Sequence, residues 1–449
     1  MLKGFFIFPF KDGENSRIIT FQLSKDNHSF FTITTEIFYM THQTISTPKQ
    51  AFVGLQMLFV AFGALVLVPL ITGLDPNTAL LTAGVGTLLF QLCTQRQVPI
   101  FLASSFAFIA PIQYGVQEWG IAVTMGGLAC TGLVYFALSL LVKWKGAQIM
   151  DRIFPPVVVG PVIIIIGLGL APVAVDMALG KTSNGAISQD MAMVVSMVTL
   201  ITTVIVAVFA KGMMKLVPIM FGIVVGYILS IFLGIVDFTP IANAAWFSLP
   251  TITTPEFRLD AILYLLPIAI APAVEHVGGV MAISSVTGQN FLKKPGLNRT
   301  LLGDGVATSA ASLLGGPPNT TYAEVTGAVM LTKNFNPKIM TWAACWAIAI
   351  SFCGKVGAFL QTIPGVVMGG IMMLVFGSIA AVGMSTLIKA KVDMGEARNL
   401  VIVSVVMTFG IGGMLINVGE FSLKGISLCA IAAIIMNLVL PKEAVKKED

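Results

Sequence analysis

The chain has 449 residues, of which 56% are hydrophobic and only 10% are charged, and its formal net charge is +5. A soluble domain carries about a quarter of its residues as charged side chains, so this composition excludes a protein whose surface faces water throughout. The mean hydropathy of +0.91 predicts a membrane protein instead. The positive residues lie in short loops between apolar runs, so the net charge does not indicate a nucleic-acid partner.

The apolar runs decide between helices and a closed barrel, the two structures that satisfy their backbone hydrogen bonds in lipid. Residues 157–171 and 194–210 are continuously apolar rather than alternating, which predicts an all-α membrane protein. The five cysteines form no CxxC or CxxH pair, so we expect no disulfide framework and no metal site. The chain shows no HExxH motif, no GxSxG motif with a plausible partner and no cofactor motif, and we expect no enzyme.

Residues 1–48 differ from the rest because they mix polar and aromatic side chains. Their one apolar stretch is short and contains Pro9, so they do not form a signal peptide. We expect a cytoplasmic extension that is disordered and has no assigned role. Translation from Met40, with the upstream residues spurious, is an open alternative.

From Gln50 onward the pattern predicts fourteen membrane spans. They cover residues 51–72, 77–94, 99–113, 120–142, 155–175, 190–210 and 216–236, and then 260–283, 298–315, 320–332, 339–360, 364–386, 399–415 and 422–440. If both termini are cytoplasmic, the outer loops hold only Lys181, Arg258 and Lys424 as basic residues, which fits the positive-inside rule.

Fourteen spans divide into two sets of seven, and an odd number per set makes the second set an inverted repeat of the first. The third span of each set is short and follows helix-breaking residues, Pro99 in one case and Pro317-Pro318 in the other. Such interrupted spans at matching places are typical of transporter binding sites. Their half-helices would present free N–H groups and a positive dipole end near the middle of the membrane.

Charged residues inside a membrane are costly and indicate function by default. Glu275 lies in the eighth span and Glu324 at the start of the tenth. We expect both to bind a ligand or a proton. The alternatives are a structural pair with neighbouring hydroxyls for Glu275 and a helix-end cap for Glu324.

Three other polar residues lie in spans. His276 points about 100° away from Glu275 around the helix, and a structural role is favoured for it. Asp304 is left open between lining the site and bonding a facing helix. For Lys355 a structural role is favoured.

Two carboxylates beside two half-helix ends offer strong acceptors and backbone donors around one point. A pyrimidine base such as uracil presents N–H donors and carbonyl acceptors along its edge and is complementary. Phe106 or Tyr322 could stack on its ring. A small anion would not suit two ionised glutamates, whereas an amino acid's ammonium group is not excluded.

The sequence resembles the nucleobase–ascorbate transporter family, and within it the bacterial uracil permease branch. The resemblance begins near Gln56 and runs to the end of the fourteenth span. Four ordered segments carry it, namely Phe62-Gly63-Ala64, Ala103-Ser104-Ser105-Phe106-Ala107-Phe108, Glu275-His276-Val277-Gly278, and Pro318-Asn319-Thr320-Thr321-Tyr322 with the following Glu324, Gly327, Thr332 and Lys333.

This resemblance implies a fold with a core domain and a gate domain, each built from both repeats. Spans three and ten would each hold a short strand and a half-helix. The domain bounds become 1–48 for the extension, 49–145 and 258–362 for the core, 150–238 and 363–441 for the gate, and 442–449 for a cytoplasmic tail. Relatives are often dimers through the gate domain, so a homodimer is expected by analogy.

The resemblance also implies the roles of single residues. Glu275 and Glu324 would bind the base by their side chains, and Phe106 and Ala323 by their backbone N–H groups. Ala64, Ser105 and Tyr322 would line the pocket. Residues expected in coupling or in support of the site are His276, Asp304 and Thr326.

Three positions depart from the family pattern. Ala323 stands where uracil permeases have glycine, Gly279 where they have a histidine tied to proton coupling, and Met57 where they have histidine. The resemblance implies import of uracil by symport with a cation, H⁺ or alternatively Na⁺, across the cytoplasmic membrane. A purine such as xanthine on the same fold, and an anion channel or exchanger, are the alternatives.

Overall fold

The computed structural model describes residues 5–12, 15–22, 46–183, 187–418 and 421–441, in two compact units, Met1–Gln50 and Ala51–Asp449. The first unit holds an antiparallel hairpin of β1 (Phe5–Asp12) and β2 (Asn15–Gln22), paired from Phe5 opposite Gln22 to Asp12 opposite Asn15. The expectation of disorder is therefore wrong for these two segments. Residues 23–45, including Met40, lie outside the described residues.

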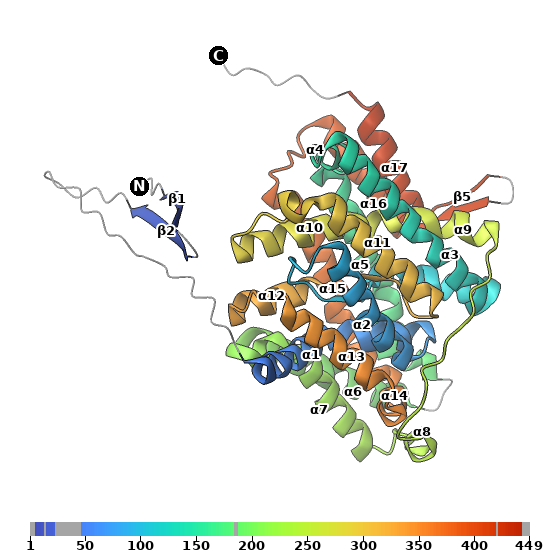
Figure 1. Cartoon of the computed structure of the whole chain (residues 1–449). Coiled ribbons are helices and arrows are strands. Elements are labelled where there is room, and N and C mark those ends of the chain that lie inside the picture. The colour runs from blue at the N-terminus through green and yellow to red at the C-terminus, as the bar shows by residue number, and fades with distance from the viewer. Residues whose placement is uncertain (1–4, 13–14, 23–45, 184–186, 419–420, 442–449) are drawn as a thin grey trace, which may run out of the picture. The chain divides into compact units, whose positions relative to one another are not determined.

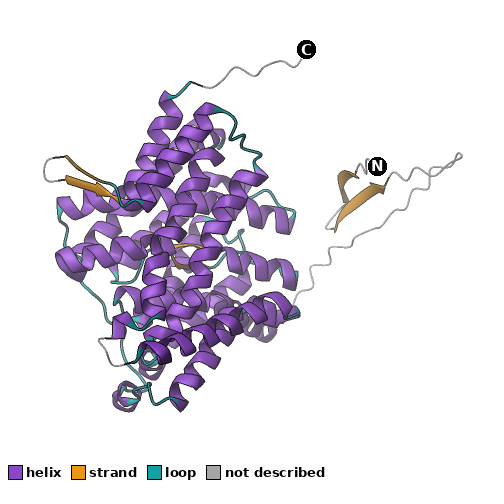
Figure 2. Ribbon diagram, turned by 180° about the vertical axis from the view of Figure 1, so that it is seen from behind, coloured by secondary structure: helices purple, strands orange, loops and turns teal. Residues whose placement is uncertain are grey.

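The second unit is almost wholly helical (Figures 1 and 2). Its helices are α1 (Thr47–Thr72), α2 (Pro76–Cys93), α3 (Ile109–Lys145), α4 (Gln148–Ile153), α5 (Pro156–Ala178), α6 (Gln189–Phe209), α7 (Pro218–Phe232), α8 (Thr239–Asn243), α9 (Leu259–Leu265), α10 (Ile270–Thr287), α11 (Leu297–Leu313), α12 (Ala323–Thr332), α13 (Lys338–Ser351), α14 (Gly354–Gln361), α15 (Gly365–Lys389), α16 (Ala397–Ile411) and α17 (Gly425–Val439). The strands are β3 (Leu102–Ser104), β4 (Asn319–Thr321), β5 (Leu415–Val418) and β6 (Phe421–Lys424).

Within the described residues, six segments are long and apolar enough to cross a bilayer, and four apolar helices are shorter. The six are Thr47–Thr72, Phe106–Lys145, Pro156–Ala178, Gln189–Phe209, Leu259–Thr287 and Gly365–Lys389. This confirms a multi-pass helical membrane protein. The count of fourteen spans and their division into inverted repeats stay predictions.

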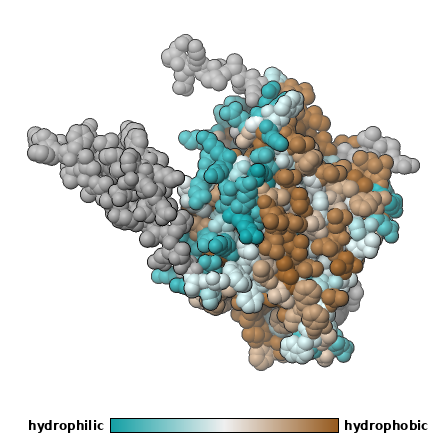
Figure 3. All heavy atoms as spheres, in the orientation of Figure 1, coloured by the Kyte–Doolittle hydropathy of each residue, from teal (hydrophilic) through white to brown (hydrophobic). Residues whose placement is uncertain are grey.

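The outer surface of the helical unit carries large apolar side chains that water would disfavour. On α6 and α7, Val194, Ile201, Val208, Val224 and Phe232 are between 51% and 83% exposed. Figure 3 shows a broad brown area of hydrophobic residues on one face of the molecule. An apolar surface of this extent is expected where lipid tails replace water.

Three predicted spans differ from the observed helices. The end of predicted span 99–113 and all of predicted span 120–142 lie in one segment, residues 106–145, that breaks at Gly120, whose φ of 83° and ψ of 171° are not helical. Predicted span 339–360 is instead divided into α13 and α14, because Cys353 leaves the helix to form a β-bridge with Phe247. Just beyond the break, the Lys355 ammonium donates to the carbonyls of Ile241 and Ala242 at the end of α8. Lys355 thus has the structural role that the sequence favoured.

The helices pack in two groups. In one, α2 and α3 pack on α11, and α13 packs on α2. In the other, α5 packs on α15, α16 and α17, and α6 packs on α7 and α15. The contacts inside each group are closest where small residues let two backbones approach, as expected between helices in lipid.

Gly132 illustrates such a close approach and gives a stability prediction. A β-carbon there would collide with Ser309 Oγ and lie 2.6 Å from Gly305 O of α11. We expect Gly132→Val to separate α3 from α11 at a cost of roughly 1–3 kcal/mol, and to lower the melting temperature of the detergent-purified protein. Gly377→Val is the matched control because a β-carbon at Gly377 on α15 meets no atom within 4 Å. Equal melting temperatures for the two variants would contradict the packing described here.

Candidate substrate site

A short antiparallel strand pair lies in the middle of the helical unit (Figure 2). Leu102 pairs with Thr321, and Ser104 with Asn319. The prolines that precede each strand disfavour helix at the residues before them, which allows extended backbone inside an otherwise helical protein. Every residue of both strands is buried, so each backbone group needs a partner within the protein.

Side chains from neighbouring helices hold the strand pair in place. The Thr308 hydroxyl donates to Asn319 O at 2.6 Å, and Asn319 Nδ2 donates to Thr82 O at 2.8 Å. On the other strand, Leu102 N donates to the Thr87 hydroxyl at 3.0 Å. The strand pair is thus fixed to α2 and α11, which makes it a rigid support for the helices that begin after it.

A helix begins directly after each strand. The first is a 3₁₀ turn, η1 (Phe106–Phe108), that continues into α3, and the second is α12. Ser105 N donates to Pro318 O at 2.9 Å, which joins the two strand ends. The N-terminal N–H groups of both helices therefore emerge from one strand pair, as the sequence predicted for spans three and ten, and they form a donor-rich region.

Glu275 and Glu324 come close to each other at this place. Glu275 lies on α10, which packs on α12, and Glu324 is in the first turn of α12. Glu275 is near enough to both Glu324 and Asp304 for their charges to interact. Protein atoms surround both glutamates, yet both side chains remain accessible at their surfaces. Both carboxylates are therefore accessible to a ligand rather than packed into a core.

The remaining predicted pocket residues come from the same segments. The rings of Phe106 and Tyr322 have centroids 6.2 Å apart and planes tilted by 46°. Phe106 is half-buried and Tyr322 is 6% exposed. Ser105 is buried, and its hydroxyl has no partner among the described residues.

Two further predicted residues are placed by their backbone alone. Ala323 is the first residue of α12, and Ala64 lies within α1. The side chains of both lie outside the described part of the chain. Of the departures from the family pattern, Met57 is fully buried on α1, and a β-carbon at Gly279 would lie 3.0 Å from Thr321 Oγ1.

A buried contact between a histidine and an aspartate lies near Glu275. His276 Nδ1 is 3.4 Å from Asp304 Oδ2, and neither side chain is exposed. The Thr320 hydroxyl donates to Asp304 Oδ2 at 3.3 Å, and the edge of Phe90 packs against the imidazole. Because an unpaired buried charge is very costly in such a place, replacing either member of the pair would destabilise the protein.

Sequence reasoning missed Tyr135, which belongs to the same polar group. Its hydroxyl on α3 is fully buried and lies close to Thr308 and Thr320 without hydrogen-bond geometry. A tyrosine in the apolar run around Val134 and Phe136 gives no hint of a partner on α11 or β4. Thr326, expected in a supporting role, is buried on α12 two residues beyond Glu324.

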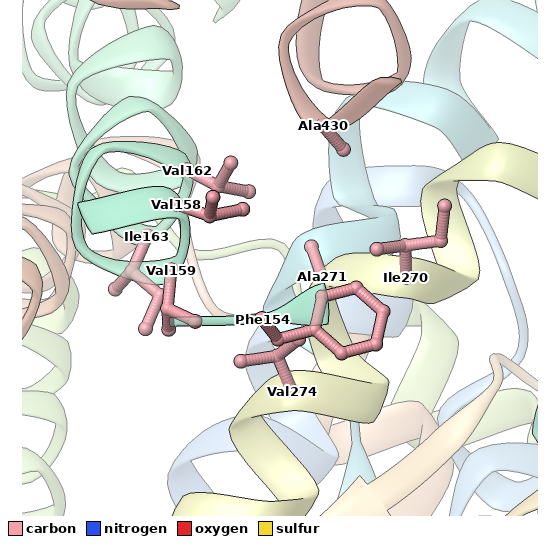
Figure 4. A pocket seen from close by; sticks show the side chains of 9 residues that line it. All are labelled: Phe154, Val158, Val159, Val162, Ile163, Ile270, Ala271, Val274 and Ala430. Carbon is pink, nitrogen blue, oxygen red and sulfur yellow. The ribbon is translucent and has the colours of Figure 1, made fainter. Parts of the chain in front are cut away.

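The site lies at the boundary between the two helix groups. Ala107 of η1 and Ala271, one turn before Glu275, pack with Val157, Val158 and Val162 of α5. Figure 4 shows the small cavity that this contact leaves between α5 and α10. Its volume of about 10 Å³ is near the least that holds one water, and its lining is entirely apolar: Phe154, Val158, Val159, Val162, Ile163, Ile270, Ala271, Val274 and Ala430. The contact between the groups therefore has no hydrogen bond to break here.

Within the part of the chain that the structure describes, no group of three His, Cys, Asp or Glu side chains could hold a metal ion. All five cysteines are free thiols.

Paired carboxylates beside two helix starts, inside a multi-pass helical protein, are typical of a membrane transporter. The sequence comparisons agree, because residues 48–419 match the Permease family. The chain belongs to this family, the nucleobase–ascorbate transporters, as the resemblance in its motifs indicated. Its members are transporters and not enzymes.

Relatives from several bacteria cover most of the chain. A probable uracil permease of Pasteurella multocida is 81% identical over 394 residues, which are 88% of this chain and 94% of the relative. The uracil permease of Bacillus caldolyticus is 44% identical over 86% of this chain and 91% of the relative. The uracil permease of Escherichia coli K12 is 39% identical, again over 86% of this chain, and over 90% of its own.

Solved structures show that the fold is shared more widely. The transmembrane domain of the cyanobacterial bicarbonate transporter BicA superposes with a TM-score of 0.61 at 18% identity, covering 88% of this chain and 98% of that domain. The murine anion transporter Slc26a9 superposes with a TM-score of 0.64 at 10% identity, covering 88% of this chain and 68% of that chain. At such identities the likeness concerns the fold alone and carries no conclusion about the transported molecule.

Proposed function

We propose that the protein imports uracil across the cytoplasmic membrane together with a proton. The observation that carries this is the approach of Glu275 to Glu324 at the two helix starts. Two carboxylates accept the ring N–H groups of the base, and the backbone N–H groups at the helix starts donate to its carbonyls. The names of relatives at 39% to 81% identity, all uracil permeases, support this cargo.

The proposed architecture has fourteen spans in two inverted repeats, with both termini in the cytoplasm. The group containing α2, α3, α11 and α13 is the core, with the base site on it, and the group containing α5, α6, α7, α15, α16 and α17 is the gate. Separate packing of the two groups supports this division. The apolar lining of the contact between α5 and α10 supports a sliding motion of core against gate. In this proposal two copies of the chain pair through their gate domains.

His276 is the proposed carrier of the coupled proton, with Asp304 as its partner. The chain has three histidines, and the other two, His28 and His42, precede the first span. Since Gly279 holds the family's usual place for a coupling histidine, His276 is the remaining imidazole in the membrane part. A proton taken up here would offset the charge of Glu275 and Asp304, and would lower the cost of moving the loaded core through the membrane.

Uptake of radiolabelled uracil by a permease-deficient bacterial strain tests the proposal. We expect saturable uptake that becomes faster as the external pH falls, because the inward proton gradient grows, and that does not change when Na⁺ is replaced by K⁺. Unlabelled uracil should compete, and unlabelled xanthine should not. No uptake by a well-expressed protein would reject uracil as the cargo, and uptake that required Na⁺ would reject the proton.

A further inference from the structure

A second cavity, of about 290 Å³, lies between the two helix groups, and neither glutamate lines it. One wall belongs to α3 and α9 and the other to α5, α16, α17 and the segment before α17. The lining residues are Ala110, Pro111, Tyr114, Tyr264, Ile165, Ile166, Gly169, Leu170, Gly410, Gly413, Gly425 and Ile426. The proposed base site at the glutamates does not include this cavity, so the cavity has no assigned role.

The two walls have different chemistry. On the α3 and α9 side, the rings of Tyr114 and Tyr264 have centroids 4.9 Å apart, and Trp119 meets both rings edge-on at 5.6 and 5.7 Å. These contacts fix the orientation of the tyrosines, so they form a preset aromatic wall. On the opposite side, a β-carbon at Gly169 would meet no atom within 4 Å. The opposite wall also holds isoleucine and leucine side chains, so a ring in the slot would meet aromatic rings on one side and glycines with aliphatic side chains on the other.

The slot begins close to the proposed base site. Ala110, which lines it, follows Phe106 by four residues along η1 and α3, which is about one helical turn. In the proposed topology, α5 and α16 run outward, so Gly169 and Gly410 lie toward their outer ends. The slot therefore lies between the outer side and the glutamates, on the path of an incoming base.

We propose that this slot is an antechamber, in which a nucleobase contacts the rings of Tyr114 and Tyr264 before it reaches Glu275 and Glu324. The inference rests on the proposed function and adds a second binding place for the same cargo. The volume of 290 Å³ lies just below the range of ligand pockets, roughly 300–1,000 Å³, whose linings are mostly apolar. A single heterocyclic ring fits this size, whereas a lipid chain would extend beyond it.

Filling the slot from its glycine wall tests the antechamber. We expect Gly169→Leu to lower the initial rate of uracil uptake about tenfold, which corresponds to a barrier about 1.4 kcal/mol higher. Equilibrium binding of radiolabelled uracil to the purified variant should stay at the wild-type affinity, because the glutamate site is untouched. Gly169→Ala adds one methyl to open space and should transport normally. Leu168→Phe adds bulk to a neighbouring side chain that does not line the slot, and it should also transport normally.

Tyr264→Leu provides an independent variant, because it removes the aromatic wall while keeping an apolar side chain. It should raise the KM for uptake and leave equilibrium binding unchanged. Wild-type uptake by both Gly169→Leu and Tyr264→Leu would overturn the antechamber while the proposed function stood. Loss of equilibrium binding together with uptake would also overturn it, as would a lipid that co-purifies with the wild type and is displaced by Gly169→Leu without a change in uptake. If the wild-type protein took up no uracil, the proposed function itself would fail.

Discussion

Replacement of Glu275 by glutamine is expected to lower uracil uptake strongly in an otherwise intact protein. The amide keeps the shape of the side chain but turns one acceptor into a donor, which would face the N–H of the base. A hydrogen bond to a charged group contributes about 1.5–3 kcal/mol, so affinity should fall by roughly 10- to 100-fold. Initial uptake rates, normalised to the amount of protein in the membrane, measure this effect.

Glu256→Gln is the matched control, since Glu256 is an exposed acid in the segment before α9. The same isosteric change there should leave uptake unchanged. Transport at the wild-type rate by Glu275→Gln would show that this carboxylate does not hold the base.

The second large effect concerns the buried pair of His276 and Asp304. Asp304→Ala leaves the imidazole without its partner in a place with no water access, and breaking a buried pair in this way costs about 3–5 kcal/mol. We expect a strongly lowered melting temperature and little protein in the membrane. Asp304→Asn should be far milder for stability, because the amide can still accept from the Thr320 hydroxyl.

The pH profile of Asp304→Asn separates coupling from mere structure. Groups that face the pair are Glu275 on α10, Tyr135 on α3 and, through Glu275, Glu324 on α12. If the pair carries the coupled proton, the neutral asparagine should leave a folded protein whose uptake no longer rises as the external pH falls. A profile that rises as in the wild type would assign the pair a structural role only.

Much of the fold follows from local features of the sequence. The six long spans follow from continuous apolar runs, and the strand pair with its half-helices follows from Pro99, Pro317 and Pro318, which prevent helix before them. Glu275 and Glu324 stand out because a charge within an apolar run has few explanations other than function. These features need no knowledge of tertiary contacts.

Other features depend on contacts between distant segments and leave no trace in the pattern. The break between α13 and α14 depends on the bridge from Cys353 to Phe247, more than a hundred residues earlier. The polar neighbours of Tyr135 are visible only in the structure, because they lie on α11 and β4, which are distant from α3 in the sequence. The pairing of His276 with Asp304 likewise requires the relative placement of α10 and α11, which a sequence pattern does not give. The hairpin of β5 and β6 falls at the ends of two predicted spans, because its strands are too short to interrupt the apolar pattern.

Equilibrium binding of radiolabelled uracil to the purified protein tests the central claim most directly, because it separates the base site from transport. The wild type should bind uracil that unlabelled uracil displaces, and Glu275→Gln and Glu324→Gln should each bind it roughly 10- to 100-fold more weakly while keeping the wild-type melting temperature. Wild-type affinity in both single variants would contradict the claim that these two carboxylates form the uracil site.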